Sequence, residues 1–467
     1  MFISAKITTL TGKDMVSIAK IFKAILNVNN VVIDNIELAV TDNGVKVLKI
    51  DLHPTKAHAN RCPHCGKRYP VYDRSLTKRK WRALDFGGMV VELYYATQRV
   101  CCKEHGVVVA SVPWAFHDSG FTKDFDLQAT YIALNINKSV AASYMRCDWK
   151  TIMRCISRAR AYLEPNIDDR LNNLVNIGID ETSYRKGHNY VTVVVNHDTN
   201  TVVWVGEGHS TETLSKFFEK LTPEQRASIK RVSGDGAKWI DACLKKYCPN
   251  AIRCVDAFHV VTWAMEALDS LRKELWHDAF DKFNEYKEEL KPKRGKPSKE
   301  NQANVDKLNS LKEKAKAIKG STYALGKAPE NLTVNQKDKL DFIADTHPKL
   351  FRGYILKEQL RLIFKLNNVD DAKEGLKHFF WRATHSRIQI FKELAYKIKR
   401  HEKNILNTIE QELSNARIES INNKIKLVIR KAYGFRNIHN MIDMILLACS
   451  EIKIPLPNRG IKQWKIA

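Results

Sequence analysis

The stretch from Leu174 to Asp256 changes its hydrophobic period in a way that limits the kind of sheet it can form. Three strand-like segments come first, "LVNIGID", "YVTVVVN" and "VVWVGEG", with the turn signal "HDTNT" between the last two. A helical pattern follows, and then "IKRVSGD", the helix-like "AKWIDACLKKY" and the short strand "AIRCVD". A meander followed by alternating helices and strands predicts a mixed α/β sheet.

Acidic residues stand at the ends of these strand-like segments. Asp180, Asp235 and Asp256 each end one segment, and His259 lies one helical turn after Asp256. A strand-end aspartate often only caps a turn or a helix, and that alternative stays open for each of them. Carboxylates that leave a sheet at one edge can instead converge on hard cations, which prefer oxygen ligands. Together they predict a site for two Mg²⁺ (or Mn²⁺) ions, which can activate an attacking oxygen and stabilise a leaving one.

A helix near the C-terminus offers a further carboxylate. The stretch "SNARIESINNKIKLVIRKAYGF", residues 414–435, places four apolar residues on one face, namely Ile418, Ile421, Ile425 and Val428. A polar run follows beside them at helical spacing: Glu419, Asn422, Asn423, Lys426 and Arg430. An ordinary solvated face is the alternative. We interpret Glu419 as the third metal ligand, carried by a helix that packs against the sheet. The cationic and amide neighbours that we expect to bind DNA phosphates are Asn422, Lys426 and Arg430.

The chain carries a large excess of positive charge. Its 467 residues include 77 Lys plus Arg against 52 Asp plus Glu, which gives a formal net charge of +25. Such an excess indicates a polyanionic partner, with nucleic acid ahead of an anionic membrane. No stretch is long and apolar enough to span a bilayer, and the N-terminus lacks the apolar core of a signal peptide. We therefore expect a cytoplasmic protein whose 10 cysteines are buried thiols or metal ligands rather than disulfides.

Two short motifs predict a zinc site. "RCPHCGKRYPVYDR" contains Cys62 and Cys65 as C-x-x-C, and "RVCCKEHG" contains Cys102 and His105 as C-x-x-H. Two such knuckles can supply the tetrahedral sulfur and nitrogen shell of a structural Zn²⁺, and the strand-like segment between them would bring them together. Cys101 can replace Cys102 in this assignment, and His64 competes with His105. Two unrelated pairs of reduced cysteines are the alternative.

The segment "DLQATYIALNINKSVAASYMRCDWKTIMRCISRARAYL" has three helical pieces with a turn at residues 147–149. It is typical of a helix-turn-helix, whose last helix enters the major groove of DNA. Lys150, Thr151 and Arg154 lie at the start of that basic last helix, and we predict that they contact DNA. A small three-helix bundle with no DNA contact shows the same pattern and stays open.

Taken together, these motifs resemble those of a known family. The blocks "GIDETSYRKGHNYVTVVVN", "VSGDGAKWI", "VDAFHVVTWAMEALDSLR" and "SNARIESINNKIKLVIRKAYGFRN" resemble DDE transposases of bacterial insertion sequences, of the ISL-three type. The match extends over most of the chain, and Ser420 stands where the family more often has Gly. The resemblance implies a ribonuclease-H-like catalytic domain in which Asp180, Asp235 and Glu419 hold the metal ions. Asp256 and His259 are then supporting residues.

The expected fold class is α+β and multidomain, with a zinc ribbon, a helix-turn-helix and an α/β catalytic domain interrupted by a long helical insertion. The expected segments are an N-terminal mixed segment (1–54), the zinc ribbon (55–120), the helix-turn-helix (121–165), the first part of the catalytic domain (170–260), the helical insertion (261–411), the final Glu helix (412–455) and a C-terminal tail (456–467).

The resulting functional prediction is a DNA transposase that binds the terminal inverted repeats of its insertion sequence and catalyses metal-dependent cleavage and strand transfer. Its expected partner is double-stranded DNA, both element ends and target, bound by a homodimer or higher oligomer in the bacterial nucleoid. No membrane partner is expected. Two alternatives stay open: a non-catalytic zinc and helix-turn-helix regulator, and a metal-dependent nuclease that cuts but does not join. Sequence does not separate cutting from joining.

Overall fold

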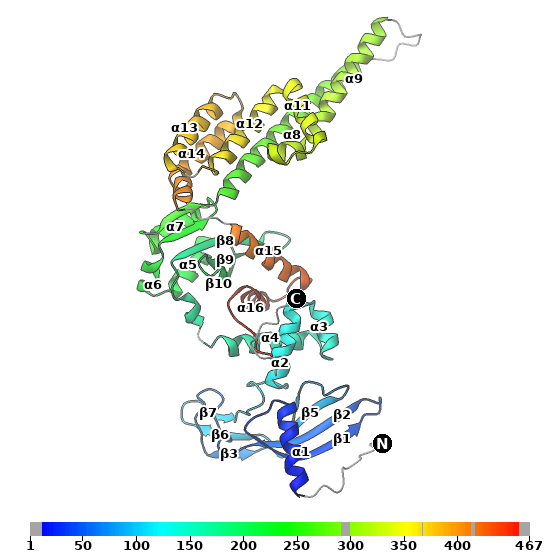
Figure 1. Ribbon diagram of the computed structural model, residues 1–467, viewed down its shortest axis with the longest axis vertical. Coiled ribbons are helices and arrows are strands. Elements are labelled where there is room, and N and C mark those ends of the chain that lie inside the picture. Colours follow the sequence, from blue (N-terminus) through cyan, green and yellow to red (C-terminus); the bar gives the residue numbers. More distant parts are fainter. Residues whose placement is uncertain (1–11, 166, 291–298, 367, 412–415, 457–467) are drawn as a thin grey trace. The chain divides into compact units, whose positions relative to one another are not determined.

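The structure is a computed structural model that describes residues 12–165, 167–290, 299–366, 368–411 and 416–456 (Figure 1). It divides into two compact units. The terminal unit comprises residues 1–170 together with residues 423–467, and the central unit comprises residues 171–422. The first 11 residues and the tail from residue 457 lie outside the described residues, as does most of the predicted C-terminal segment.

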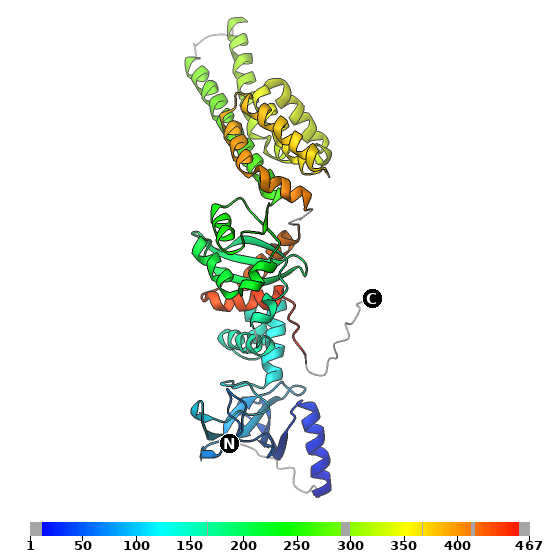
Figure 2. The same cartoon turned by 90° about the vertical axis from the view of Figure 1, so that its left-hand side faces the viewer.

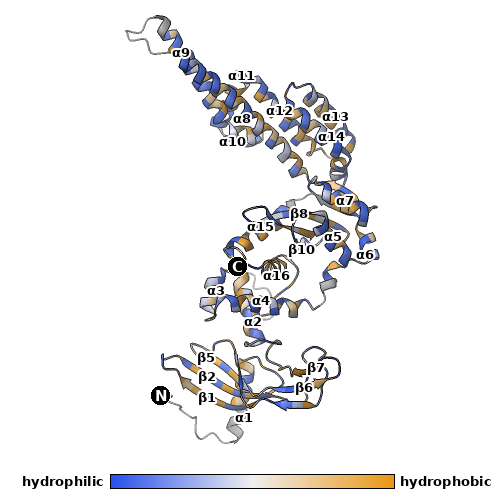
Figure 3. Cartoon of the chain, turned by 180° about the vertical axis from the view of Figure 1, so that it is seen from behind, coloured by the Kyte–Doolittle hydropathy of each residue, from blue (hydrophilic) through white to orange (hydrophobic). Residues whose placement is uncertain are grey.

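The terminal unit begins with helix α1 (Gly12–Ile25) and a four-stranded sheet of order β1-β2-β5-β4. Its strands are β1 (Val31–Val40), β2 (Lys46–Pro54), β4 (Arg79–Arg82) and β5 (Val90–Tyr95). Hydropathy alternates along these strands, and their inward residues, such as Ile50, Trp81 and Leu93, form one core (Figure 3). Because β2 pairs in parallel with β5, the predicted boundary at residue 54 falls inside one sheet.

A second, three-stranded sheet of order β3-β6-β7 carries the cysteine motifs. Its strands are β3 (Val71–Arg74), β6 (Gln98–Cys102) and β7 (Gly106–Val109). Cys62 and Cys65 precede β3, Cys102 ends β6, and His105 lies in the turn before β7. The antiparallel pairing of β6 with both neighbours brings the two motifs to the same end of the sheet.

Three helices follow: α2 (Lys123–Asn135), α3 (Lys138–Tyr144) and α4 (Trp149–Leu163). The side chains of Thr122, Asn137 and Asp148 accept hydrogen bonds from backbone N–H groups at their starts, which fixes where each helix begins. Helix α16 (Ile438–Cys449) packs on α4 and α2. Asp443 of α16 accepts a 2.8 Å hydrogen bond from Ser157 and forms an ion pair with Arg160. The C-terminal helix therefore packs with these helices in the terminal unit.

The central unit contains a five-stranded sheet of order β10-β9-β8-β11-β12. Its strands are β8 (Asn176–Arg185), β9 (Asn189–Asn196), β10 (Thr201–Glu207), β11 (Arg231–Gly234) and β12 (Ile252–Val255). The first three form an antiparallel meander, and β11 and β12 run parallel to β8. Its short helices are α5 (Thr211–Lys220), α6 (Pro223–Ser228) and α7 (Lys238–Tyr247), and η1 (Ile167–Leu171) ends at its first residue. The mixed α/β sheet predicted from the hydrophobic period is thus present.

A helical region separates β12 from the last helices. It consists of α8 (Ala257–Glu289), α9 (Lys299–Lys319), α10 (Thr322–Gly326), η2 (Pro329–Asn331), α11 (Val334–Thr346), α12 (Pro348–Ile363), α13 (Val369–Thr384) and α14 (Gln389–Glu410). Helices α8 and α9 run side by side (Figure 2), and one apolar core joins α8 to α12, α13 and α14. Thr408 of α14 donates a 2.7 Å hydrogen bond to the carbonyl of Val255, so the end of α14 covers the outer edge of β12.

Within the described residues, every helix is too short or too polar to cross a membrane.

Candidate metal centres and nucleic-acid interface

The register of the central sheet brings three of the predicted aspartates to one level. Gly234 of β11 aligns with Ile179 of β8 on one side and with Val255 of β12 on the other. Asp180 follows Ile179, Asp235 follows Gly234, and Asp256 follows Val255. Asp235 and Asp256 follow the ends of β11 and β12, but β8 continues to Arg185 and Asp180 pairs with Val193 of β9, so the prediction that Asp180 ends its strand is wrong. Because adjacent strands are about 4.8 Å apart, the shared register still places Asp180 beside Asp235.

Asp180 lies in a desolvated and highly constrained position. Its Oδ1 accepts a 2.8 Å hydrogen bond from the backbone N–H of Glu181, and its Oδ2 accepts one from the side-chain amide of Asn422. Burial raises the pKa of Asp180 above its usual value, and the charge of Asp235 acts in the same direction, against the hydrogen bonds and His259. A bound cation would relieve both of these unfavourable effects, so the position fits a metal ligand.

The other two aspartates differ in their local roles. Asp235 is half-buried, and its Oδ1 accepts a 3.1 Å hydrogen bond from the backbone of Ala237. Asp256 is buried and caps α8, with its side chain accepting a 3.0 Å hydrogen bond from the backbone of Phe258. His259 Nε2 lies 3.8 Å from Asp256 Oδ2. Of the three aspartates, Asp256 is the one that caps a helix, which was the alternative considered for each of them. This is compatible with the prediction that Asp256 supports the site and does not itself bind the metal ions.

Helix α15 (Ala416–Lys431) packs directly on β8 because the strand lacks a side chain at the contact. A Cβ at Gly178 would lie 2.1 Å from Cδ1 of Ile418, which is only 2% exposed. The predicted apolar face is buried along its whole length, at Ile418, Ile421, Ile425 and Val428. Glu419 follows Ile418 and is exposed.

Asn422 lies one turn after Ile418 and holds Asp180 in place. Its amide N–H₂ group donates to Asp180, and its carbonyl oxygen accepts a 3.2 Å hydrogen bond from the hydroxyl of Thr182. We predicted that Asn422 contacts DNA, but both ends of its amide are engaged with β8. These two hydrogen bonds hold Asn422 against β8, and its contact with DNA stays a prediction. The sequence contains a signal for the packing of α15 on β8, because an isolated Gly in a strand, here Gly178, indicates the close approach of a neighbouring element.

The carboxylates of Asp180, Asp235 and Glu419 do not form a closed shell. Among the described residues, a tight group of three or more metal-ligating side chains occurs only in the cysteine region. The structure therefore brings Asp180 and Asp235 together on adjacent strands and places Glu419 on the neighbouring helix with its side chain in solvent.

The cysteine region does form such a shell. The ligand atoms of Cys62, Cys65, Cys102 and His105 all lie within 4.8 Å of one another. The sulfur atoms of Cys65 and Cys102 are 3.8 Å apart, and Nδ1 of His105 lies 3.4 Å from Cys102 Sγ and 3.8 Å from Cys62 Sγ. Tetrahedral Zn–S bonds of about 2.3 Å hold two sulfur ligands about 3.8 Å apart, so these residues fit zinc.

The two competing ligands lie outside this shell. Cys101 is exposed on β6 and points away from Cys102, because successive side chains of a strand alternate. The ring centre of His64 lies 5.0 Å from that of His105, with the two rings tilted by 30°, and His64 does not join the group. Burial raises the pKa of the Cys102 thiol, but hydrogen bonds from His105 and the backbone outweigh it and lower the pKa to about 6. A thiol that ionises so readily suits a zinc ligand.

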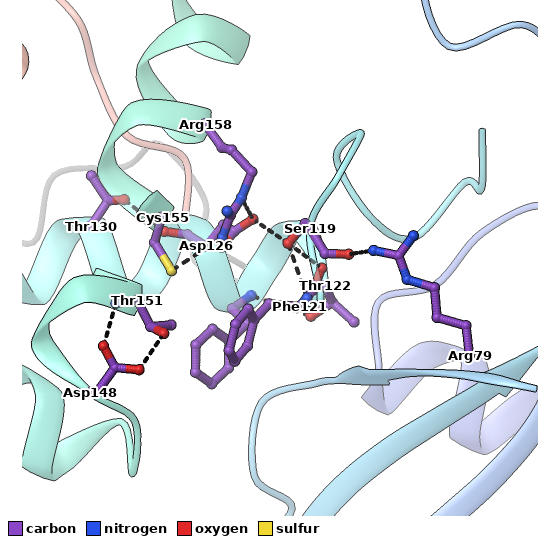
Figure 4. Close-up of polar contacts among 11 residues, drawn as sticks. Arg79, Ser119, Phe121, Thr122, Asp126, Thr130, Asp148, Thr151, Cys155 and Arg158 are labelled. Carbon is purple, nitrogen blue, oxygen red and sulfur yellow. Dashed lines mark hydrogen bonds and ion pairs between the residues drawn. The ribbon is translucent and has the colours of Figure 1, made fainter. Parts of the chain in front are cut away.

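Helix α4 presents part of the predicted DNA-contacting set. Lys150 and Arg154 are exposed and lie one turn apart. Thr151 is only 7% exposed, and its hydroxyl donates a 2.8 Å hydrogen bond to Asp148 at the helix start (Figure 4). Thr151 therefore completes the helix cap, and the prediction that it contacts DNA is not supported. Lys426 and Arg430 are exposed on α15, where a role in DNA binding stays a prediction.

Comparisons with known proteins agree with this arrangement. A family profile described as a transposase, of the DDE ISL3 type, matches residues 177–445, which include all of the central sheet except its first residue, the helical insertion, α15 and most of α16. The chain belongs to the ISL3 family of transposases. A second profile, described as the zinc finger of the transposases IS204, IS1001, IS1096 and IS1165, matches residues 58–105 of this family member and contains all four zinc-site residues.

Curated relatives extend the match to nearly the full length of this transposase family member. It is 40% identical over 443 residues to the transposase for insertion sequence element IS1557 from two strains of Mycobacterium tuberculosis, covering 94% of this chain and 97% of the relative. It is 26% identical over 397 residues to the transposase for insertion sequence element IS1001 of Bordetella parapertussis, covering 84% of this chain and 89% of the relative.

Proposed function

We propose that this ISL3 family member is a DNA transposase that binds the terminal inverted repeats of its insertion sequence and catalyses DNA cleavage and strand transfer. The observation that carries the proposal is the register of Asp180 and Asp235 on adjacent parallel strands, with α15 packed on β8 one residue before Glu419. Carboxylates on neighbouring elements supply oxygen ligands of the kind that Mg²⁺ or Mn²⁺ prefers.

The residues divide into distinct roles in this proposal. Asp180, Asp235 and Glu419 hold the metal ions, which supply an activated oxygen and stabilise the leaving oxygen. Asn422 keeps the carboxylate of Asp180 pointed at the site, and Asp256 and His259 support the same sheet edge. Water attacks a phosphodiester at the element end and releases a 3′-OH. That hydroxyl then attacks a second DNA phosphate and displaces its 3′ oxygen, so no covalent protein intermediate is needed.

The sheet supports a ribonuclease-H-like fold for this region, since it combines an antiparallel meander with parallel crossover strands. Cys62, Cys65, Cys102 and His105 hold one structural Zn²⁺, which closes the shell with four protein ligands. Helices α2 to α4 act as a helix-turn-helix in which Lys150 and Arg154 contact the element ends, and Lys426 and Arg430 contact phosphates. The net charge of +25 supports tight binding of DNA, both ends and target, in the bacterial nucleoid by a homodimer or higher oligomer.

A strand-transfer assay with labelled terminal DNA tests the catalytic proposal. Asp180→Asn, Asp235→Asn and Glu419→Gln should each abolish cleavage while leaving DNA binding intact. Asp371→Asn and Glu374→Gln on the exposed side of α13 are matched controls that should cleave normally. Replacement of Mg²⁺ by Ca²⁺ should allow binding without chemistry, because its looser coordination misplaces the reacting oxygens. Normal cleavage by any of the three site variants would remove that residue from the site.

The same assay separates the two alternatives. A metal-dependent nuclease would release the cleaved strand but would never join it to a second DNA. A non-catalytic regulator would bind the ends and give neither product. Joined product from the unaltered protein, and its loss in the three variants, would exclude both.

A further inference from the structure

A cavity opens beside the start of helix α4, in the terminal unit. Its volume is about 580 Å³, which lies in the range of small-molecule sites. It is lined by the first three turns of α4 and by residues of the segment from Phe435 to Asn440, which leads into α16, and His117, Asp118 and Lys138 complete the lining. We refer to it as the α4 cavity. The predicted DNA-contacting residues Lys150 and Arg154 therefore do not stand on a free convex helix but line a hollow.

The α4 cavity combines aromatic surface with positive charge. Trp149, which is 42% exposed, and Phe435 both line it. The Nζ atom of Lys138 lies 4.5 Å from the centre of the Phe435 ring, which fixes the ring in place by a cation–π contact. Three exposed cations lie along the opening, namely Lys150, Arg154 and Arg436. This pairing of stacking surfaces with cations matches the chemistry of a nucleotide, which has an apolar base face and an anionic phosphate.

The base of the cavity is rigid. Arg158, which also lines it, donates 2.8 and 2.7 Å hydrogen bonds to the two oxygens of the fully buried Asp126 (Figure 4). Asp126 also accepts a 3.0 Å hydrogen bond from Ser119, so the pair is fully connected. Met153 is buried and closes the cavity behind Trp149. A rigid, concave site favours a small group that fits inside it over the broad surface of a DNA duplex.

We propose that the α4 cavity binds one unpaired nucleotide of the DNA, with its base against Trp149 and Phe435 and its phosphates on Lys150, Arg154 and Arg436. A base inside a duplex is stacked on both faces and does not reach the aromatic side chains, so the nucleotide must be extrahelical or at a frayed end. The proposal rests on the DNA-binding part of the proposed function and adds the form of DNA that the helix recognises.

The test compares the affinity of the full-length protein for two DNAs. One is a blunt duplex, and the other is the same duplex with a single extrahelical 2-aminopurine nucleotide. Stacking on aromatic side chains should make the second DNA bind about 5- to 150-fold more tightly. The fluorescence of the 2-aminopurine should also fall on binding, because the stacked base is quenched.

Variants of the two aromatic residues identify the site. Trp149→Ala combined with Phe435→Ala should remove both the preference and the quenching and leave the affinity for the blunt duplex unchanged. Trp149→Phe keeps a stacking surface and should retain most of both. Tyr144→Ala is the matched control, since Tyr144 is an aromatic residue of α3 that is 67% exposed and lies outside the cavity. Zinc content and thermal unfolding of each variant show that the terminal unit stays folded.

Each outcome decides the proposal. Equal affinity of the unaltered protein for the two DNAs, or a preference that survives in the double variant, overturns it and leaves the transposase function intact. Failure to bind either DNA overturns this inference and the DNA-binding part of the proposed function together.

Discussion

Gly178→Ala should displace helix α15 and with it Glu419. The new methyl group would lie 2.1 Å from Cδ1 of Ile418 and 2.8 Å from Nε2 of His197, whereas carbon atoms in contact are normally about 3.5–4.0 Å apart. His197 is 4% exposed and is held by a 2.6 Å hydrogen bond to Ser233, so it cannot yield. Ile418 is equally enclosed. The clash must therefore move the helix by an appreciable fraction of an ångström or more.

A second substitution, Ile418→Val, separates the cost of the steric clash from the other effects of Gly178→Ala. Overpacking a closed core costs about 1–3 kcal/mol, against about 0.5–1 kcal/mol that a Gly-to-Ala change otherwise gains in a strand. Ile418→Val removes the offending Cδ1 atom and costs about 0.5–1.5 kcal/mol alone. In the double variant the 2.1 Å contact with Cδ1 is removed while the 2.8 Å contact with Nε2 of His197 remains, so the clash is partly relieved and the free energies of unfolding should be non-additive by about 1–2 kcal/mol.

Two measurements test this reasoning. Thermal or denaturant unfolding of the four proteins in the cycle gives the coupling free energy, and cleavage of element-end DNA gives the functional effect. A displacement near 1 Å can cost about 100-fold in rate, so Gly178→Ala should cleave far more slowly than its stability implies, and Ile418→Val should partly restore it. Gly88→Ala, where a Cβ would meet nothing within 4 Å, should change neither. Additive unfolding free energies, or normal cleavage by Gly178→Ala, would refute the packing argument.

Three further predictions address the other parts of the chain. Cys102→Ser should lower the metal content from about one Zn²⁺ per chain and Cys101→Ser should not, as elemental analysis of the purified proteins would show. Replacing Lys150 and Arg154 by Ala should reduce the preference for element ends over random DNA by about 1–3 kcal/mol, measured by competition across a salt series; an unchanged preference would place recognition elsewhere. Hydrogen bonds from its own backbone, a lysine and an arginine lower the pKa of Glu330 from 4.5 to about 2, so its contribution to stability is present above pH 4.5 and is lost as the pH falls toward 2. Unfolding of a Glu330→Gln variant should lack this part of the acid dependence.

The features that sequence predicted correctly are those fixed by local spacing. The zinc residues lie on two tight turns, so a three-residue motif already determines which side chains share a face. The strands of the central sheet follow from their apolar runs, and the buried face of α15 follows from its period. In each case the signal lies within a single element or between elements joined by short connections.

Features that depend on distant pairings escaped prediction. The parallel pairing of β2 with β5 joins residues some 40 positions apart, and no local pattern specifies it. The packing of α16 on α2 and α4 depends on Asp443 meeting Ser157 and Arg160 across nearly 300 residues. From sequence alone, a polar residue on a helix face is interpreted as facing solvent, because its hydrogen-bond partner in a distant segment is not known. The hydrogen bond from the Asn422 amide to Asp180 is one such partner that the sequence does not reveal.

The two metal centres differ in a way that follows from where their ligands lie. The zinc residues close on one another in the protein alone, as a structural site with four protein ligands must. The acidic residues do not close, because Asp180 is desolvated and held by Asn422 while Glu419 extends into solvent from the next helix. Mg²⁺ is usually held by one or two carboxylates together with substrate phosphates. On the proposed function, an open acidic shell is therefore the form expected before DNA binds, and the scissile phosphate would supply the oxygen ligands that the protein lacks.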